Sequence, residues 1–332
     1  MKIIMIGHGM VGHKFIESVL EHVGDDVEIT ILAEEPRLAY DRVHLTEYFS
    51  GKSAKDLTLC RTDFADAYGI DLRLNTKAVA IDQSHKTVTT NHGDVLSFDK
   101  LILATGSYAF VPPISGNDRE NCFVYRTIED LDAIRAASLN AKSGVVIGGG
   151  LLGLEAAKAL RDLNLETHVV EFAPRLMAVQ IDDLGGKVLR AKIENLGVKV
   201  HTQKATSSIE EGATTKHVMK FGDGSELETD IILFSAGIRP RDELARQSGL
   251  ALGERGGIMI NDYCQTSNPD IYAIGECALW QNKIYGLVAP GYDMARIAAK
   301  HVTEQACAEF AGADMSTCLL YTSPSPRDVE ES

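Results

Sequence analysis

Two short glycine-rich segments of the same form could hold diphosphate groups. The first, GHGMVG, spans residues 7–12, and the second, GGGLLG, spans residues 148–153. In this motif the first glycine allows a tight turn, the second lets backbone N–H groups approach a diphosphate, and the third lets helix and strand pack closely. The sequence therefore predicts two dinucleotide sites. Their binding residues are Gly7, Gly9, Met10 and Gly12 in the first copy and Gly148, Gly150, Leu151 and Gly153 in the second.

Acidic residues follow each glycine motif at the distance that a dinucleotide site requires. Glu34 lies 22 residues after Gly12, and Glu171 lies 18 residues after Gly153. A carboxylate at the end of the second strand of such a unit accepts hydrogen bonds from ribose hydroxyl groups. We predict that Glu34 and its neighbour Glu35 bind the first nucleotide. At Glu171 the carboxylate favours NADH over NADPH, because it repels a 2′-phosphate.

The residues around each motif have the pattern of a strand, a helix and a second strand. For the first motif we predict a strand over residues 2–6, a helix over 14–23 and a strand over 27–32. For the second we predict a strand over 144–147, a helix ending near Leu163 and a strand over 167–170. One such motif alone is a weak indication, because glycine-rich turns also arise for backbone reasons. Two copies, each within a full strand–helix–strand pattern, favour an α/β protein with two Rossmann-like domains.

Two apolar runs that end in small residues and proline indicate domain boundaries. They are residues 99–113 and residues 230–240. We predict a first dinucleotide-binding domain made of residues 1–112 and 241–317, with a second domain, residues 113–240, inserted into it. A helix is expected over residues 292–310. Residues 318–332 lack helical and strand periodicity, and we predict a disordered or artefactual tail.

The composition argues against several kinds of partner. The chain has 33 basic and 47 acidic residues, and its net charge of −14 repels nucleic acid and anionic membranes. No apolar run approaches the roughly 20 residues that span a bilayer. Because the N-terminus also runs into a strand without a signal peptide, we predict a cytoplasmic protein. The six cysteines form no C-x-x-C pair, and we assign none of them to a disulfide, a metal site or chemistry.

Further segments carry a resemblance to a known family. With the two glycine motifs, Leu103-Ala104-Thr105-Gly106 and Tyr272-Ala273-Ile274-Gly275-Glu276 resemble the FAD-dependent pyridine nucleotide-disulfide oxidoreductases over residues 1–317. The resemblance implies that the first domain binds FAD and the inserted domain binds NAD(P)H. It places Glu276 where the family holds the ribityl chain of the flavin, usually with aspartate. The residues that it adds to the cofactor sites are Thr105, Gly106, Gly237, Gly275 and Glu276.

Three more stretches resemble one branch, the N-terminal flavin module of assimilatory nitrite reductase large subunits. They are residues 34–45, residues 171–177, and residues 275–280 with 286–292. The branch implies electron transfer from NADH through FAD to iron–sulfur and siroheme centres that reduce nitrite to ammonia. This sequence has no cysteine cluster able to ligate an iron–sulfur centre, so we expect those centres only in a missing C-terminal part. The implied partners are NADH and an electron-acceptor domain or a small iron–sulfur protein, and a homodimer is left open.

Two residues outside the glycine motifs have roles that the resemblance implies. Glu155 is similar to the glutamate that anchors the nicotinamide carboxamide, and it is our candidate catalytic residue. Alternatively, Glu155 is a carboxylate favoured by the dipole at a helix N-terminus. Arg42 is similar to an arginine near the FAD diphosphate, and the alternative is a surface ion pair with Glu34, Glu35 or Asp41.

Two other functions fit the same residues. A stand-alone NADH:rubredoxin or NADH:ferredoxin reductase would use both nucleotides in the same way. A non-catalytic redox sensor would bind both nucleotides without turnover. Fast bleaching of the flavin by NADH would distinguish an enzyme from a sensor.

Overall fold

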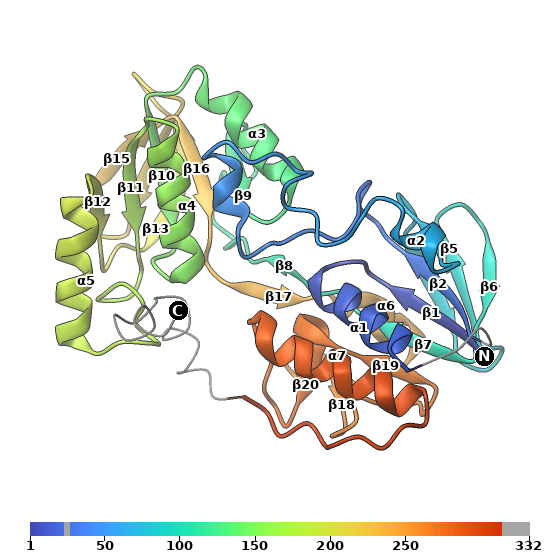
Figure 1. Ribbon diagram of the computed structural model, residues 1–332. Helices are drawn as coiled ribbons and strands as arrows, with labels where there is room; N and C mark the ends of the chain where they lie inside the picture. Colours follow the sequence, from blue (N-terminus) through green and yellow to red (C-terminus); the bar gives the residue numbers. More distant parts are fainter. Residues whose placement is uncertain (23–26, 314–332) are drawn as a thin grey trace, which may run out of the picture. The chain divides into compact units, whose positions relative to one another are not determined.

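The computed structural model of the chain describes residues 1–22 and 27–313 (Figure 1). These residues form two compact units. The first contains residues 1–36, 69–106 and 242–313, and the second contains residues 37–68 and 107–241. The boundaries predicted near residues 112 and 240 separate an FAD-binding domain from an NAD(P)H-binding domain. This division into nucleotide-binding domains stays a prediction. The predicted tail over residues 318–332 lies outside the described residues.

A parallel five-stranded sheet forms the centre of the first unit. Its strand order is β3-β2-β1-β7-β19. These strands are β1 (Lys2–Ile6), β2 (Glu28–Leu32), β3 (Asp71–Arg73), β7 (Lys100–Leu103) and β19 (Ile271–Ala273). Helix α1 (Met10–Leu20) follows β1 and packs against α7 (Val288–Val302). Phe15, Ile16 and Val19 are buried on α1 at the spacing of one helix face, which explains why this segment is helical.

Smaller elements complete the first unit. An antiparallel sheet contains β4 (Ala78–Asp82), β5 (Thr87–Thr90) and β6 (Val95–Ser97). A parallel pair contains β18 (Ile258–Ile260) and β20 (Ala278–Trp280). The remaining helices are α6 (Glu243–Ser248) and the 3₁₀ helix η2 (Gly275–Cys277).

The second unit repeats the parallel sheet of the first. Its strand order is β12-β11-β10-β16-β9, again with the strand before the glycine motif in the centre. These strands are β9 (Cys122–Val124), β10 (Ser143–Ile147), β11 (Glu166–Val170), β12 (Val198–His201) and β16 (Ile231–Phe234). The helices are η1 (Leu45–Tyr48), α2 (Phe64–Ala67), α3 (Ile128–Ser138), α4 (Leu151–Asp162) and α5 (Asp183–Asn195).

The second unit also repeats the antiparallel sheet. Its strands are β13 (Thr206–Glu211), β14 (His217–Phe221) and β15 (Glu226–Thr229). The short strands β8 (Ser107–Ala109) and β17 (Ile238–Pro240) pair with each other. In both units the chain therefore passes from the central strand directly into a helix, α1 or α4, at a glycine motif. This is the position that suits a ligand in a parallel α/β sheet.

Residues 37–68 group with the second unit because their apolar side chains enter its core. Tyr40, Leu45 and Leu57 are buried in one cluster with Val146 and Leu160. Segments distant in sequence are joined here by apolar contact. Periodicity in the sequence gives no signal for such a contact.

The structure corrects the predicted helix over residues 292–310. Helix α7 begins earlier, at Val288, and ends at Val302. Glu304 has a φ of 57°, a left-handed conformation that cannot continue a right-handed helix. Residues 305–313 form neither helix nor strand. Across the described residues, no helix combines the length and the apolar character needed to cross a membrane.

Candidate functional site

The first glycine motif forms a tight turn between β1 and α1. Gly7 has a φ of +101°, and its N–H donates to the carbonyl of Leu32 at 2.9 Å. A Cβ atom at Gly7 would lie 2.3 Å from the carbonyl oxygen of Ala104, and one at Gly12 would lie 2.6 Å from the carbonyl oxygen of Gly7. Side chains are therefore excluded at both positions by backbone atoms.

Gly9 lies in open space. It is the N-cap of α1, a Cβ atom there would meet no atom within 4 Å, and no side chain caps the helix. Met10 is the first residue of the helix. Uncapped N–H groups at a helix start carry partial positive charge and bind anions well. The residues present therefore fit the diphosphate of a dinucleotide such as FAD.

The second glycine motif reproduces this geometry between β10 and α4. Gly148 has a φ of +121°, and a Cβ atom on it would lie 2.2 Å from the carbonyl oxygen of Ser235. A Cβ atom at Gly153 would lie 2.0 Å from the carbonyl oxygen of Gly148, whereas Gly150 again meets nothing within 4 Å. Gly150 is the uncapped N-cap of α4, and Leu151 is its first residue. A second diphosphate therefore fits here.

Residues from distant segments meet at the first motif. A Cβ atom at Gly7 would lie 3.3 Å from the backbone nitrogen of Thr105, and one at Gly275 would lie 3.3 Å from the Cβ atom of Val11. The structure thus brings Gly7, Thr105 and Gly275 together around the start of α1. Glu276 follows in η2 and is half-buried. Its role at the ribityl chain stays a prediction.

Gly106 and Gly237 share one backbone feature. Their φ angles are +69° and +106°, and a Cβ atom on either would meet nothing within 4 Å. Gly106 belongs to the first unit and Gly237 to the second. The backbone conformation accounts for glycine at both positions, and their predicted cofactor contacts stay predictions.

Glu34 and Glu35 follow β2 in the first unit. Glu34 is exposed, and its Oε1 atom lies 3.1 Å from the amine of Lys77. The carbonyl of Glu35 accepts a bond from the N–H of Asn75 at 3.3 Å. Lys77 is 43 residues from Glu34, and no pattern in the sequence pointed to this pair.

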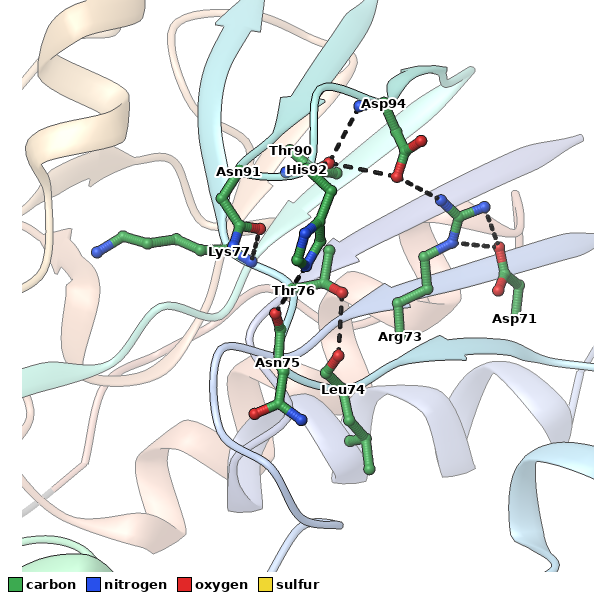
Figure 2. A network of polar contacts seen from close by, with 10 residues as sticks. All are labelled: Asp71, Arg73, Leu74, Asn75, Thr76, Lys77, Thr90, Asn91, His92 and Asp94. Carbon is green, nitrogen blue, oxygen red and sulfur yellow. Dashed lines mark hydrogen bonds and ion pairs between the residues drawn. The ribbon is translucent and has the colours of Figure 1, made fainter.

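Figure 2 shows the polar network that holds the segment containing Lys77. The backbone N–H of Lys77 donates to the side-chain oxygen of Asn91 at 2.8 Å, and Nε2 of His92 donates to the carbonyl of Asn75 at 3.1 Å. Arg73 forms ion pairs with Asp71 and Asp94 in the same network. The β5–β6 hairpin therefore positions the backbone from which Lys77 reaches Glu34.

Glu171 is bonded to the second glycine motif itself. Its Oε2 atom accepts from the N–H of Gly149 at 2.5 Å, and its Oε1 atom accepts from the N–H of Ala173 at 2.7 Å. A Cβ atom at Gly149 would lie 2.6 Å from the side chain of Leu176 and 3.0 Å from the carboxylate. Gly149 was not among the predicted site residues, although its place in the middle of three consecutive glycines is a usable signal.

Glu155 lies on α4, which packs on η1 in the second unit. Its side chain is half-buried, and this burial raises its pKa, whereas the charge of His44 opposes the rise. His44 is held by Asp41, whose Oδ2 atom lies 2.6 Å from Nδ1. Glu155 is thus a carboxylate in a partly apolar setting, which either predicted role allows.

Arg42 is fixed within the second unit. Its Nη1 atom donates to the carbonyl of Arg126 at 2.9 Å, and its guanidinium lies 4.5 Å from the ring centre of Tyr40. The first glycine motif belongs to the other unit, so the role of Arg42 at the FAD diphosphate stays a prediction. Within residues 1–22 and 27–313, no group of three or more His, Cys, Asp or Glu residues is placed to hold a metal ion.

Comparison with known proteins adds independent findings. Residues 1–301 match the family model of the pyridine nucleotide-disulphide oxidoreductases. The chain is 54% identical over 320 residues to the nitrite reductase (NADH) large subunit of Escherichia coli K12, covering 96% of this chain and 38% of that protein. It is 56% identical over 321 residues to the nitrite reductase [NAD(P)H] large subunit of Klebsiella oxytoca, covering 96% of this chain and 33% of that protein.

A solved structure resembles the whole described fold. The ferredoxin reductase of Rhodopseudomonas palustris superposes with a TM-score of 0.87 at 26% identity, covering 94% of this chain and 78% of that one. The chain thus spans between 33% and 38% of the length of the two nitrite reductase subunits that it matches.

Proposed function

We propose that this chain, which belongs to the pyridine nucleotide-disulphide oxidoreductase family, binds NADH and FAD as the flavin part of a nitrite reductase large subunit. The observation that carries the proposal is identity at more than half of the aligned positions to two such subunits along almost the whole chain. The duplicated glycine turns support it, since each offers an uncapped helix start to a diphosphate.

The first motif is the proposed FAD site. Gly9 and the start of α1 would hold the diphosphate, and Glu34, positioned by Lys77, would accept the ribose hydroxyl groups. Thr105, Gly275 and Glu276 would contact the remainder of the cofactor. When bound, FAD supplies the conversion between a two-electron hydride donor and one-electron acceptors.

The second motif is the proposed NADH site. Gly150 and the start of α4 would hold the diphosphate of NADH. The Glu171 carboxylate is fixed by two backbone N–H groups, so its charge stays beside the ribose position and opposes a 2′-phosphate. Glu155 would accept a hydrogen bond from the nicotinamide carboxamide and so fix the orientation of the ring.

The proposal places the electron acceptors in other domains of a longer protein. Iron–sulfur and siroheme centres of the longer protein would take electrons from the flavin part and reduce nitrite to ammonia. The resemblance to a ferredoxin reductase favours one alternative, a stand-alone reductase that delivers electrons to a separate iron–sulfur protein. The coding sequence downstream distinguishes them, because only the nitrite reductase continues into cysteine-rich and siroheme-binding domains.

Anaerobic mixing of the FAD-loaded chain with NADH tests the proposal. We expect the purified protein to bind FAD and to lose its flavin absorbance within seconds at millimolar NADH. The test variant is Glu155→Gln, which should still bind FAD but should show slower reduction of the flavin by NADH, since a neutral amide is a weaker acceptor for the carboxamide. A chain that binds FAD without any bleaching by NADH would instead support the redox sensor, and a chain that does not take up FAD would refute both.

A further inference from the structure

The connection between β3 and β4 is bonded to the acidic end of β2. We call residues 74–77, which lie between these two strands, the linker. The N–H of Ala33, just after β2, donates to the carbonyl of Arg73 at 2.9 Å. The N–H of Thr76 in the linker donates to the carbonyl of Ala33 at 2.8 Å. The backbone beside Glu34 is therefore held by a segment that lies far along the chain.

Asn91 holds the backbone of Lys77, the last residue of the linker, from two sides. Its side-chain oxygen accepts from the N–H of Lys77 at 2.8 Å, and its own N–H donates to the carbonyl of Lys77 at 2.8 Å. The neighbouring residues Ala78 and Thr90 are a pair of the β4–β5 ladder, so Asn91 extends that ladder by one position. In Figure 2 the Asn91 amide faces the Lys77 backbone, and the lysine side chain extends away from the network.

The turn that carries Asn91 is itself fixed. Thr90 is 2% exposed, and its hydroxyl oxygen accepts from the N–H groups of His92 and Asp94, both at 3.3 Å. The Oδ2 atom of Asp94 lies 3.4 Å from Nη1 of Arg73, the last residue of β3. The backbone of Asn91 therefore has a defined place relative to β3 and the linker.

The pair of Lys77 with Glu34 depends on such a fixed backbone because the pair is exposed. The Lys77 and Glu34 side chains are 59% and 47% exposed. An exposed ion pair gains little free energy, since water screens the charges and two long side chains lose conformational freedom. Bonds that fix the Lys77 backbone lower this entropic cost, because the amine then extends from a defined point beside Glu34.

The charge of Lys77 suits the ligand proposed for the first site. The bond from the N–H of Gly7 to the carbonyl of Leu32 places the first glycine motif beside the end of β2, close to Glu34. A carboxylate there without a cation would repel the diphosphate proposed to bind at the start of α1. Lys77 offsets this repulsion, and the oxygens of Glu34 can still accept from ribose hydroxyl groups.

We propose that Asn91 is a positioning residue for the adenosine half of FAD. Asn91 holds the Lys77 backbone, Lys77 holds the Glu34 carboxylate, and Glu34 accepts the ribose hydroxyl groups. The assignment rests on the proposed function, because it requires FAD at the first glycine motif. It limits the effect of Asn91 to one half of the cofactor. FMN has the same flavin ring and ribityl phosphate but lacks the adenosine, so its binding does not depend on Asn91.

Titration of the flavin-free 332-residue chain with FAD and with FMN tests the assignment. We expect Asn91→Ala to weaken FAD binding about fivefold, the upper end for an exposed ion pair, and to leave FMN binding unchanged. Asn91→Asp should restore the FAD affinity, because a carboxylate also accepts from the N–H of Lys77. Asn261→Ala is the matched control. Asn261 is an exposed asparagine of the same unit whose side-chain oxygen accepts from the N–H groups of Tyr263 and Gln265, and its loss should leave both affinities unchanged.

A double-mutant cycle separates positioning of Glu34 from a general structural effect. Glu34→Gln should weaken FAD binding, and adding Asn91→Ala should weaken it little further, because Asn91 acts through Glu34. Additive losses would overturn the assignment, and so would equal weakening of FAD and FMN or wild-type FAD affinity in Asn91→Ala. A wild-type chain that takes up no FAD would refute the proposed function and this assignment together.

Discussion

The Glu171 carboxylate both accepts two backbone hydrogen bonds and carries a negative charge, so a substitution that tests one role should spare the other. Its two oxygens accept bonds from the N–H groups of Gly149 and Ala173. In the proposed NADH site its negative charge would also lie beside the ribose. An arginine here would remove both bonds together with the charge. A glutamine removes the charge but keeps one acceptor oxygen, and so one of the two bonds, which disturbs the loop less than arginine would.

We predict that Glu171→Gln raises the NADPH-to-NADH ratio of flavin reduction rates by about tenfold, equivalent to about 1.4 kcal/mol. The reason is the loss of repulsion against a 2′-phosphate. Stopped-flow reduction of the bound flavin with each nucleotide measures the ratio. Glu210→Gln is the control, because Glu210 is an exposed carboxylate on β13 of the same unit and should leave the ratio unchanged. Equal ratios in Glu171→Gln and the wild type would refute the selectivity argument.

His8 is a buried histidine within the first glycine motif. It is 8% exposed, neither ring nitrogen has a hydrogen-bond partner, and its ring meets that of His13 edge-on at 5.5 Å. Burial, together with a smaller contribution from positive charge on His13, lowers its pKa to about 4. Glu17 lies 3.6 Å from Nε2 of His13 and is the nearest carboxylate described there. His8 is therefore neutral in the folded protein near pH 7.

The lowered pKa of His8 predicts a loss of stability in acid. Between about pH 6.5 and pH 4 the unfolded chain binds a proton at this residue and the folded chain does not, so the free energy of unfolding falls as the pH falls. The full effect is at most about 3 kcal/mol. We expect His8→Phe to weaken this pH dependence while keeping the stability at pH 7. Urea unfolding at pH 7 and pH 4.5 measures it, and identical pH dependence in both proteins would contradict the prediction.

At the scale of elements, the close approach of α1 and α7 depends on a glycine inside a helix. A Cβ atom at Gly291 in α7 would lie 2.6 Å from Cγ2 of Val11 in α1 and 3.6 Å from the Cα atom of Gly275. Glycine normally weakens a helix interior by about 1 kcal/mol relative to alanine. Its presence here is explained by packing, because Val11 also borders Gly275 beside the proposed FAD site.

We predict that Gly291→Ala destabilises the chain although alanine favours helix. Overpacking costs about 1–3 kcal/mol, which exceeds the gain of about 1 kcal/mol in helix propensity. Val11→Ala removes the clashing methyl group, so the double variant should be more stable than the sum of the two single effects indicates. Denaturant unfolding of all four proteins gives this coupling energy. Additive effects would show that the contact does not limit the helix spacing.

The sequence predicted some elements well because their signals are local. The strands at residues 2–6 and 144–147 agree with β1 and β10, since continuous apolar runs before glycine turns have few other solutions. Helix α1 begins at Met10, four residues before the predicted start, because Gly9 is already the N-cap. The predicted extension of α7 to residue 310 was wrong because the ring of Phe310 packs against Trp280, a tertiary contact that leaves no local signal in the sequence.

The site was predicted less completely than the fold. Glycine spacing located both turns, because backbone geometry alone demands those residues. The pair of Lys77 with Glu34 depends on a long-range contact that leaves no periodic pattern in the sequence. Figure 2 illustrates this, because its network joins residues from β3, the β5–β6 hairpin and the connection between them.

At the scale of the whole molecule, the two proposed nucleotide sites belong to different compact units. Gly9 and Gly150 occupy equivalent positions in them, each as an uncapped helix N-cap with open space at the Cβ position. Both have extended backbone angles that alanine adopts. Alanine lowers the entropy of the unfolded chain but is a poorer N-cap than glycine, so the two effects oppose each other and stability should change little. A methyl group would nevertheless occupy the space that a diphosphate needs.

We predict that alanine at one position impairs FAD binding and that alanine at the other impairs reduction by NADH. Gly9→Ala should weaken FAD binding by at least about tenfold, equivalent to about 1.4 kcal/mol, whereas Gly150→Ala should retain FAD and lose its rapid reduction by NADH. Gly12→Ala and Gly153→Ala are contrasting variants, because their Cβ atoms would lie 2.6 and 2.0 Å from backbone oxygens and should destabilise the fold itself. FAD titration and stopped-flow reduction, each paired with thermal unfolding, distinguish these outcomes. If Gly150→Ala lost FAD as completely as Gly9→Ala, the assignment of one nucleotide to each unit would fail.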